Sequence, residues 1–428
     1  MGRLYLIQPV VGIYGFCFFM CIPLLQQYVY ARLWERLSSA PYSSSQSTHC
    51  ANSSSNLTLT YKEVQKEASL FILYVELSVL LPSMFSSPLL VSCSDSRGRK
   101  VAMVPPLLGN LFFSLCCLLI SCFSLDLRLL LGAGFLMGLL GGPAALLGAS
   151  FAYVADRCRE AGPRGTEGGA GGPGEVTEVR QSPSRHRTVS MASVELALGL
   201  ISGVAPACTG VFIHTIGFSW PFLIASVLHL LNLAYVLLVL QDSLVPEVLG
   251  QLQSVYTMFQ KGSRKRNTAL GLILATFALF KMCKDGGMSI IILYQLNQPL
   301  CWTELLIGYS ALLGVVIHLG SYAGVSLWSR CLEDSSVVLI GLLSLAAVRV
   351  PLILSEMPNS ILRSMMSHLV PSSEQGAVFA CVVFLEMVSV FVALVLFNTT
   401  YAATVSWFPG FSFLLASLLT VLPALLMG

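Results

Sequence analysis

The sequence predicts an all-α membrane protein with about twelve transmembrane helices in two bundles of six. Three observations predict this fold class. Hydrophobic residues make up 55% of the 428-residue chain and charged residues only 11%, whereas about a quarter of a typical soluble domain is charged. Apolar runs of about 20 residues, the length of a membrane-spanning helix, follow one another along the chain. A polar, basic stretch from Gln241 to Asn267 divides the chain into two halves.

Each apolar run is expected to form a helix, because a helix satisfies its own backbone hydrogen bonds in lipid. The first run keeps Gln26 and Gln27 near its end, and no small-residue cleavage site follows it, so it predicts a retained helix rather than a signal peptide. The expected helices span roughly residues 4–28, 70–91, 101–123, 127–154, 189–212, 219–241, 267–293, 304–328, 377–399 and 408–427.

The ninth and tenth helices are expected within residues 335–371, where the chain is short. Two straight crossings of a hydrocarbon core ~30 Å thick need about 40 residues at ~1.5 Å each. Residues 335–368 supply about 34, interrupted by Pro351 and Pro358. Either these two helices are short and distorted, or the sequence lacks part of a helix.

The basic residues predict which side of the membrane each loop faces. One loop contains Arg97, Arg99 and Lys100, a second contains the arginines of residues 157–187, and a third contains the basic residues of 261–266. All three fall on the same side if the helices alternate, and cytosolic loops carry the excess of Lys and Arg. That side is therefore predicted to be cytosolic. The basic loops account for the net charge of +3, so this charge does not indicate nucleic-acid binding. We expect the lipid bilayer as a partner and no nucleic acid.

The opposite side carries the loop of residues 32–68, which contains N-glycosylation sequons at Asn52 and Asn56. Sequons and charge bias thus agree on the orientation. Cys50 lies in this loop and Cys301 in another non-cytosolic loop, where oxidation is possible. We predict that these two cysteines pair, the alternative being two free thiols.

The expected domains follow from these boundaries. Residues 1–241 form an N-terminal six-helix bundle, 242–266 a cytosolic linker, and 267–428 a C-terminal helix bundle. The loop of residues 157–187 is glycine-rich and poor in apolar residues, so it predicts a flexible cytosolic segment. Glycines at i, i+4 spacing mark tight helix contacts or a glycine-lined cavity face. They are Gly134, Gly138, Gly142, Gly199 and Gly203.

Ionisable residues inside the predicted helices are candidates for function, because a charge at bilayer depth costs at least ~2.5 kcal/mol. A carboxyl group in a partly dry cavity can take up a proton on one side of the membrane and release it on the other. Glu195 is the first choice for proton coupling and Glu76 the second, with a hydrogen-bonded packing role for Glu76 as the alternative. The other intramembrane ionisable residues are Lys281, Lys284, Asp285, His318, Arg363 and Glu386.

The cations among them suggest an anionic substrate. A guanidinium pairs with a carboxylate or phosphate group at two points, so Arg363 is the candidate for substrate binding. The alternative for Lys281 and Asp285 is that they form a local ion pair, because residues four apart in a helix are neighbours. Glu386 is expected at a bundle interface, and His318 as a hydrogen-bonded structural group.

The short charged loop Ser94–Lys100 resembles the signature loop of the major facilitator superfamily of transporters, which joins the second and third helices on the cytosolic side. Its motif residues here are Asp95, Gly98, Arg99 and Lys100. With Asp156, at the cytosolic end of the fourth helix, Asp95 and Arg99 are predicted to form an ion-pair network. Such a network would hold one gate closed and break as the two halves rock.

A narrower resemblance is to solute carrier family 46, the family of the proton-coupled folate transporter. It rests on Gln27–Tyr30, Ser94–Lys100, Ser150–Asp156, Pro299–Trp302, Ile307–Tyr309 and Glu374–Gly376. Three further stretches resemble the subgroup that exports steroid conjugates and other amphipathic anions from lysosomes with protons. They are Glu63–Lys66, Phe379–Glu386 and Ala403–Phe411.

The resemblance implies roles for individual residues. Glu195 falls on the family's proton-coupling acid of the fifth helix, Arg363 on the tenth-helix arginine linked to substrate and proton binding, and Cys50 with Cys301 on the loop disulfide. We expect further substrate contacts at Lys284 and Tyr309.

The sequence also departs from the family pattern. Lys284 replaces the folate transporter's seventh-helix histidine and Gly142 its fourth-helix acid, which argues against folate as substrate. Ser190 stands where the family has an arginine, and roughly fifteen residues are absent around 342–350.

The expected function is therefore proton-coupled symport of organic anions, such as steroid conjugates or bile-acid-like molecules, by alternating access. The lysosomal membrane is the expected location and the plasma membrane the alternative. A folate-type symporter, or a non-transporting receptor or adaptor on a transporter scaffold, are the alternative functions. The sequence has no phosphate-cradling loop, metal-ligand cluster or nucleophile with a base, so we expect no enzymatic activity, metal or cofactor.

Overall fold

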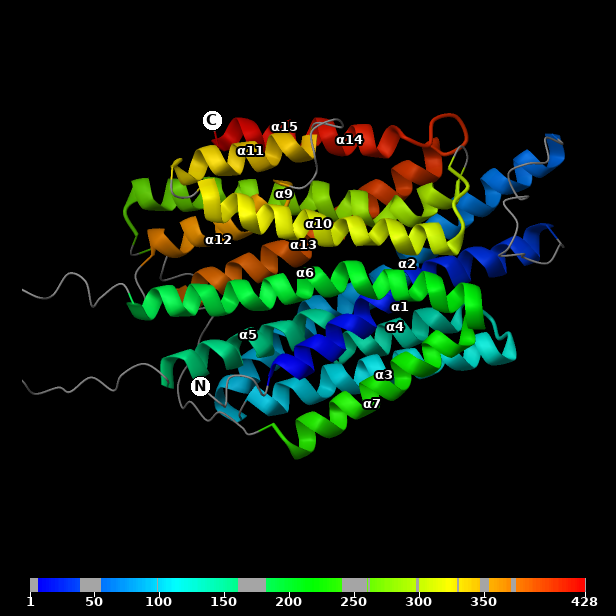
Figure 1. Cartoon of the computed structure of the whole chain (residues 1–428), viewed down its shortest axis with the longest axis horizontal. Coiled ribbons are helices and arrows are strands. Elements are labelled where there is room, and N and C mark those ends of the chain that lie inside the picture. The colour runs from blue at the N-terminus through cyan, green and yellow to red at the C-terminus, as the bar shows by residue number, and fades with distance from the viewer. Residues whose placement is uncertain are drawn as a thin grey trace, which may run out of the picture.

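The computed structural model describes residues 7–38, 55–97, 99–160, 182–240, 260, 262–297, 300–328, 331–346, 354–370 and 375–427. At some helical positions, among them 55–61, 91–97, 99, 154–160 and 182–195, only the backbone is described. The described part of the chain is almost entirely helical (Figure 1). Eight of its helical segments are long and apolar enough to cross a membrane, so the predicted all-α membrane class is confirmed.

The helices of the first half, here called the N-terminal group, are α1 (Gln8–Ser38), α2 (Ser55–Arg97), α3 (Arg99–Phe123), α4 (Leu129–Leu139), α5 (Gly142–Glu160), α6 (Ser182–Ile216) and α7 (Ser219–Leu238). Those of the second half, the C-terminal group, are α9 (Arg264–Leu296), α10 (Glu304–Trp328), α11 (Asp334–Ala346), α12 (Met357–Leu369), α13 (Gln375–Thr404), α14 (Phe411–Leu419) and α15 (Val421–Met427). We call the end of the molecule where α1 ends and α2 begins the outer end, and the opposite end the inner end.

Two of the predicted helices are broken. The expected helix 127–154 is divided into α4 and α5, because Gly141 and Gly142 have φ values of 101° and 53°, a left-handed conformation that only glycine adopts at low cost. The expected helix 408–427 is divided at Thr420 into α14 and α15. Pro423 lies just beyond that break and cannot donate a helix hydrogen bond.

The expected ninth and tenth helices correspond to α11 and α12. α12 has 13 residues between its caps at Glu356 and Val370, and a helix of this size is about 20 Å long, against ~30 Å for the hydrocarbon core. The described part of α11 ends at Ala346, and residues 347–353 lie outside the described part of the chain. The tenth helix is therefore short, whereas a short ninth helix stays a prediction.

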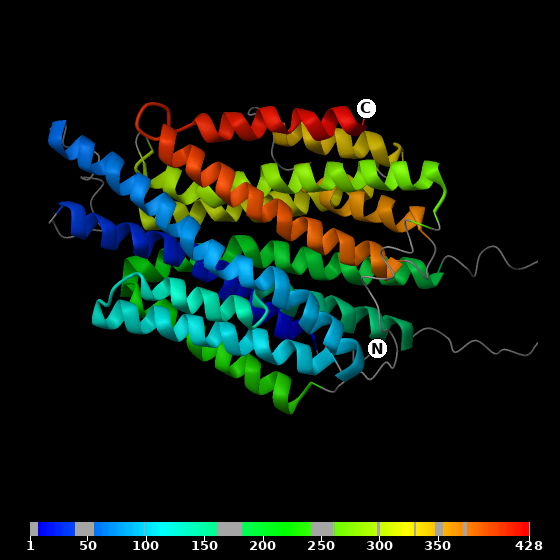
Figure 2. The ribbon, with the colours of Figure 1, turned by 180° about the vertical axis from the view of Figure 1, so that it is seen from behind.

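The two groups meet mainly through two helix pairs, α6 with α10 and α2 with α13. Figures 1 and 2 show α6 beside α10 on one side of the molecule, and α2 crossing α13 on the other. α9 contacts α1 and α2 over a smaller area.

Glycine allows the α6–α10 pair to pack closely. A Cβ atom at Gly199 would overlap the His318 ring, and one at Gly203 would overlap the Val315 side chain. Gly210 lies against the backbone of Gly308. Small residues bring helix backbones together where lipid provides no hydrophobic drive to associate. In the N-terminal group, Gly134 and Gly138 pack against α2 in the same way.

The described hydrogen bonds between the two groups all join the outer halves of helices. Ser69 of α2 donates to the backbone oxygen of Asn398 in α13 at 3.2 Å, and Gln65 accepts from Tyr401 at 3.5 Å. Lys62 donates to the Ser406 carbonyl at 2.7 Å. Gln26 of α1 donates to the Ser289 carbonyl in α9 at 3.5 Å. In the described residues, therefore, the two groups are held together at the outer end.

Candidate functional site

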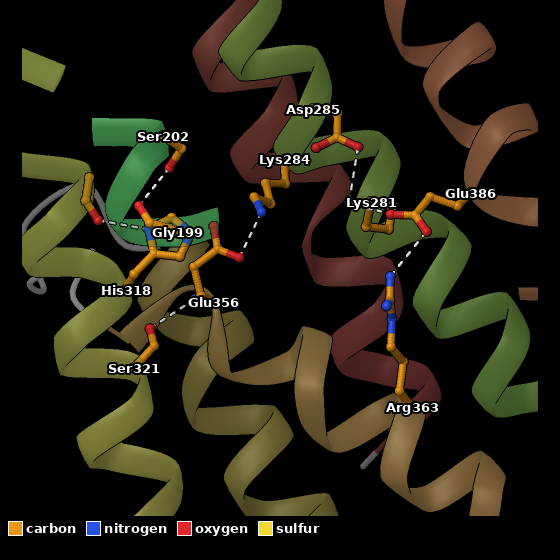
Figure 3. A network of polar contacts seen from close by, with 11 residues as sticks. Gly199, Ser202, Lys281, Lys284, Asp285, His318, Ser321, Glu356, Arg363 and Glu386 are labelled. Atoms are coloured by element: carbon orange, nitrogen blue, oxygen red, sulfur yellow. Dashed lines mark hydrogen bonds and ion pairs between the residues drawn. The ribbon is translucent and has the colours of Figure 1, made fainter. Parts of the chain in front are cut away.

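The middle of α9 carries three charged residues that point in two directions. Lys281 and Asp285 are one helical turn apart and share a face, whereas Lys284 is rotated by about 100° from Asp285. Figure 3 shows Lys281 directed toward Glu386 of α13, with Asp285 one turn away, and Lys284 directed toward Glu356, which precedes α12. Each direction leads to a separate set of partners.

The first set, here called the central charge cluster, consists of Lys281, Asp285, Arg363 and Glu386. The Lys281 ammonium lies 3.4 Å from the Asp285 carboxylate and 2.8 Å from Oε1 of Glu386. The other Glu386 oxygen, Oε2, accepts a hydrogen bond from Arg363 at 3.0 Å. Glu386 therefore bridges a cation of α9 and a cation of α12 (Figure 3).

The cluster is internally neutral and partly accessible. Its two cations are matched by two carboxylates, as membrane-embedded charges require. The Lys281 side chain is only 10% exposed, but Arg363 and Glu386 are 25% and 27% exposed. The Arg363 guanidinium also lies over the Phe277 ring, 5.6 Å from its centroid, a cation–π contact. The arginine is thus held between an anion and an aromatic face while remaining reachable.

The second set joins Lys284 to Glu356. The Lys284 ammonium lies 2.6 Å from Oε2 of Glu356, and the Glu356 backbone N–H donates to the Ser321 hydroxyl of α10 at 3.2 Å. This pair connects α9, α10 and the start of α12. The sequence marked Lys284 as a substrate contact, and the structure shows its charge neutralised by a carboxylate.

His318 of α10 lies beside this second pair. Its Nδ1–H donates to the Gly314 carbonyl of the same helix at 2.7 Å, so it has the hydrogen-bonded role that the sequence suggested. Its ring packs on Gly199 of α6, next to Ser202 (Figure 3). The second pair therefore adjoins the interface between the two groups.

Of the two residues predicted to couple the proton, the structure describes the side chain of Glu76 but not that of Glu195. Glu195 lies in α6, one turn before Gly199, and its side chain is outside the described residues. Glu76 lies in α2 on the helical face of Gln65 and Ser69, which contact α13. Its Oε2 atom is buried and has no hydrogen-bond partner among the described residues.

The remaining predicted site residues do not join the cluster in the described structure. Tyr309 lies in α10 with 53% of its surface exposed, next to the Gly308 contact with α6. Lys100 donates to the Leu237 carbonyl of α7 at 2.8 Å, at the inner end. Gly98 and the side chains of Asp95, Arg99 and Asp156 lie outside the described residues, so their gate network remains a prediction.

The outer-loop predictions are largely outside the described structure. Cys301 is disulfide-bonded, but its partner is not described, and pairing with Cys50 remains a prediction. Asn52 lies outside the described residues, and Asn56 is in the first turn of α2 with an undescribed side chain.

The sequence named Lys281 and Glu386 among the intramembrane ionisable residues, but it offered Lys281 only a local pair with Asp285, placed Glu386 at a bundle interface, and gave Glu356 no role. The rule that every intramembrane charge needs a partner could have drawn attention to all three. That rule alone does not say which anion meets which cation.

No family model matches the chain, but curated relatives match over almost its whole length. It is 36% identical to the lysosomal proton-coupled steroid conjugate and bile acid symporter SLC46A3 of Gallus gallus, covering 99% of this chain and 93% of the relative. The Homo sapiens protein of that name is 34% identical over the same shares. The proton-coupled folate transporter of Rattus norvegicus is 28% identical, covering 99% and 91%. The Gallus gallus alignment, 454 positions long, exceeds the 428 residues of this chain, so that relative has residues without a counterpart here.

Solved structures share the fold at low sequence identity. The human organic anion transporter MFSD10 superposes with a TM-score of 0.63 at 16% identity, covering 100% of this chain and 99% of its own. The D-xylose–proton symporter gives a TM-score of 0.58 at 15% identity, covering 99% and 97%. Identities this low establish the fold alone, and that fold is the one expected from the Asp95–Lys100 loop, the major facilitator fold.

Proposed function

Because the chain belongs to solute carrier family 46, we propose that it is a proton-coupled symporter of amphipathic organic anions. Steroid conjugates and bile-acid-like molecules are the proposed substrate class, in keeping with the names of the relatives at 34–36% identity. The same names support the lysosomal membrane as its location, with the plasma membrane as the alternative. Transport proceeds by alternating access between an N-terminal bundle (1–241) and a C-terminal bundle (267–428), joined by a linker (242–266).

The observation that carries this proposal is the setting of Arg363. It is a cation in the middle of a helix bundle, partly exposed, held by Glu386 and stacked on Phe277. A planar guanidinium suits the two-point recognition of a sulfate or carboxylate group, and the aromatic ring beside it suits an apolar skeleton. We assign Arg363 to the anionic group of the substrate, with Lys284 and Tyr309 as further contacts.

Proton coupling is assigned to Glu195, with Glu76 as the second candidate. Glu195, Gly199 and Gly203 are spaced by four residues and therefore lie on the same face of α6, which packs on α10. Protonation of Glu195 would thus change the charge at the interface between the two groups, which moves during transport. Glu76 offers a buried carboxyl oxygen without a partner among the described residues. Burial of this kind favours the protonated form of a carboxyl group.

The contacts between the two groups at the outer end support the proposed mechanism. Hydrogen bonds between described residues join the two groups in the outer halves of the helices, and such bonds would hold an outer gate closed. Residues Asp95, Gly98, Arg99, Lys100 and Asp156 are proposed as the gate at the inner end.

The test is uptake of estrone sulfate into proteoliposomes with an acidic exterior. We expect pH-dependent uptake by the wild type and its loss in Glu195→Gln. Absence of pH-dependent flux, with Glu195→Gln indistinguishable from the wild type, would overturn the proposal.

A non-transporting receptor or adaptor is the second candidate, and one observation favours it. Helix α12 has 13 residues, which is too short for a straight crossing. This candidate predicts that estrone sulfate binds but is not taken up. A folate-transport role is disfavoured by Lys284 and Gly142. If the protein did transport folate, excess folate would abolish estrone sulfate uptake.

A further inference from the structure

We propose that Lys281 and Arg363 together form one anion site, and that Glu386 occupies it in place of the substrate's sulfate or carboxylate. Protonation of Glu386 would then open the site to the substrate. This inference rests on the proposed transport function and adds, beside the proton-coupling residue Glu195, a second protonatable residue that controls access of the anion to the substrate site.

The geometry shows a site already filled by an anion. The two Glu386 oxygens contact different cations, Lys281 at 2.8 Å and Arg363 at 3.0 Å. These cations come from α9 and α12, whereas the carboxylate comes from α13. A substrate sulfate or carboxylate also offers separate oxygens to two donors. It could therefore replace the Glu386 carboxylate with the same contacts.

Charge balance makes the exchange depend on a proton. The central charge cluster has two cations and two carboxylates, so its formal charge is zero. Addition of an anionic substrate would leave one uncompensated negative charge in a poorly solvated site, which is costly. If Glu386 takes up a proton, the cluster becomes +1 and the anion restores neutrality. Proton and anion therefore bind together and leave together.

The charged groups around Glu386 are consistent with this exchange. α9 presents Lys281 and Asp285, with Lys284 further away, and α12 presents Arg363. α2, which also packs on α13, has Glu76 on the face toward it. α14, which packs on α13 as well, contains no ionisable residue.

Asp285 is a matched control for Glu386 within the same cluster. It carries the same charge, but in the described structure it forms an ion pair with Lys281 alone, at 3.4 Å. Asp285→Asn therefore removes one negative charge without vacating the position beside Arg363.

The experiment measures binding of radiolabelled estrone sulfate to the purified full chain at about pH 5.5 and about pH 7.5. If substrate binding requires protonation of Glu386, the wild-type dissociation constant rises by up to about 100-fold from the lower to the higher pH. Glu386→Gln should reduce this ratio to less than about threefold and bind more tightly than the wild type at the higher pH. Asp285→Asn also adds one unit of positive charge to the cluster, so it should bind more tightly at both pH values. It should nevertheless keep most of the wild-type ratio, because the Glu386 carboxylate still fills the site at the higher pH.

Three results would overturn the inference. They are an unchanged pH ratio in Glu386→Gln, loss of binding at both pH values by a folded Glu386→Gln protein, and an equal effect of Asp285→Asn. Lys281→Met supplies an independent test should Glu386→Gln not fold. It should weaken binding at the lower pH by about tenfold, and unchanged binding would exclude the two-cation site.

Failure of this inference is distinguishable from failure of the proposed function. If the wild type neither binds nor transports estrone sulfate, the proposed function fails. If the wild type shows pH-dependent binding and uptake while the Glu386 and Lys281 variants behave like it, only the inference fails.

Discussion

Glu386 accepts a hydrogen bond from Arg363 at 3.0 Å across the contact between α13 and α12. The residues lie 23 positions apart in the sequence, and both are partly exposed. Desolvation offsets part of the Coulombic attraction in a pair that is partly removed from water. The exchange proposed above requires this pair to open.

Arg363→Lys should lower the affinity for estrone sulfate by at least about tenfold, because an ammonium group cannot make the planar two-point contact of a guanidinium. Equilibrium binding at acidic pH checks this result. Arg128→Lys, at an exposed outer position, is the matched control and should bind normally. Equal affinities in the two variants would contradict the assignment of Arg363.

Lys284 and Glu356 should be energetically coupled, since their charged atoms lie 2.6 Å apart. Lys284→Met and Glu356→Gln should each lower thermal stability, and the double variant should lose less than the sum. A double-mutant cycle on the free energy of unfolding should give a coupling of about 1–3 kcal/mol. Additive losses would show that the pair contributes nothing to stability.

Gly199→Ala should destabilise the α6–α10 interface, because the new methyl group would overlap the His318 ring. Overpacking of this kind costs about 1–3 kcal/mol, and estrone sulfate uptake should fall with it. Thermal unfolding and uptake are the measurements. Gly271→Ala is the control, since nothing lies within 4 Å of a Cβ atom there. The double variant Gly199→Ala/His318→Ala should recover stability, and no recovery would refute the steric explanation.

Asn398→Ala should weaken the contact between α13 and α9 near the outer end, whereas Ser69 of α2 can still donate to the backbone oxygen at this position. Asn398 is fully buried, accepts from Ser69 of α2 and donates to Ser289 of α9 at 3.2 Å. Interhelical hydrogen bonds in membrane proteins contribute about 0.6–2 kcal/mol each, so the melting temperature should fall measurably. Thr399→Ala should have little effect, because the Thr399 hydroxyl bonds only within its own helix in the described structure.

Cys50→Ser should release the thiol of Cys301, which is disulfide-bonded in the structure. Thiol labelling of the denatured, unreduced protein should show the newly accessible Cys301, and Cys50→Ser/Cys301→Ser should abolish that gain. No gain in Cys50→Ser would assign Cys301 to another partner.

The sequence by itself determined the class of the molecule and the position of its charges. Hydropathy is a local property, so the apolar runs predicted the helices, and the count of residues in 335–371 predicted a shortened region, in which α12 is short. The i, i+4 spacing of Lys281 and Asp285 predicted their contact, because helix geometry sets the distance between such residues. The glycines of α6 similarly predicted a close helix contact.

Only the tertiary structure decided which charges meet. Lys281 reaches Glu386 of α13 at a shorter distance than Asp285 of its own helix, and Lys284 reaches Glu356 rather than facing the same way as its neighbours. Such pairs depend on how each helix is rotated and tilted against its neighbours, and those angles are set by side-chain packing over the whole interface. The sequence therefore showed which residues carry charge at membrane depth, whereas the packing of α9, α12 and α13 placed one carboxylate between two cations.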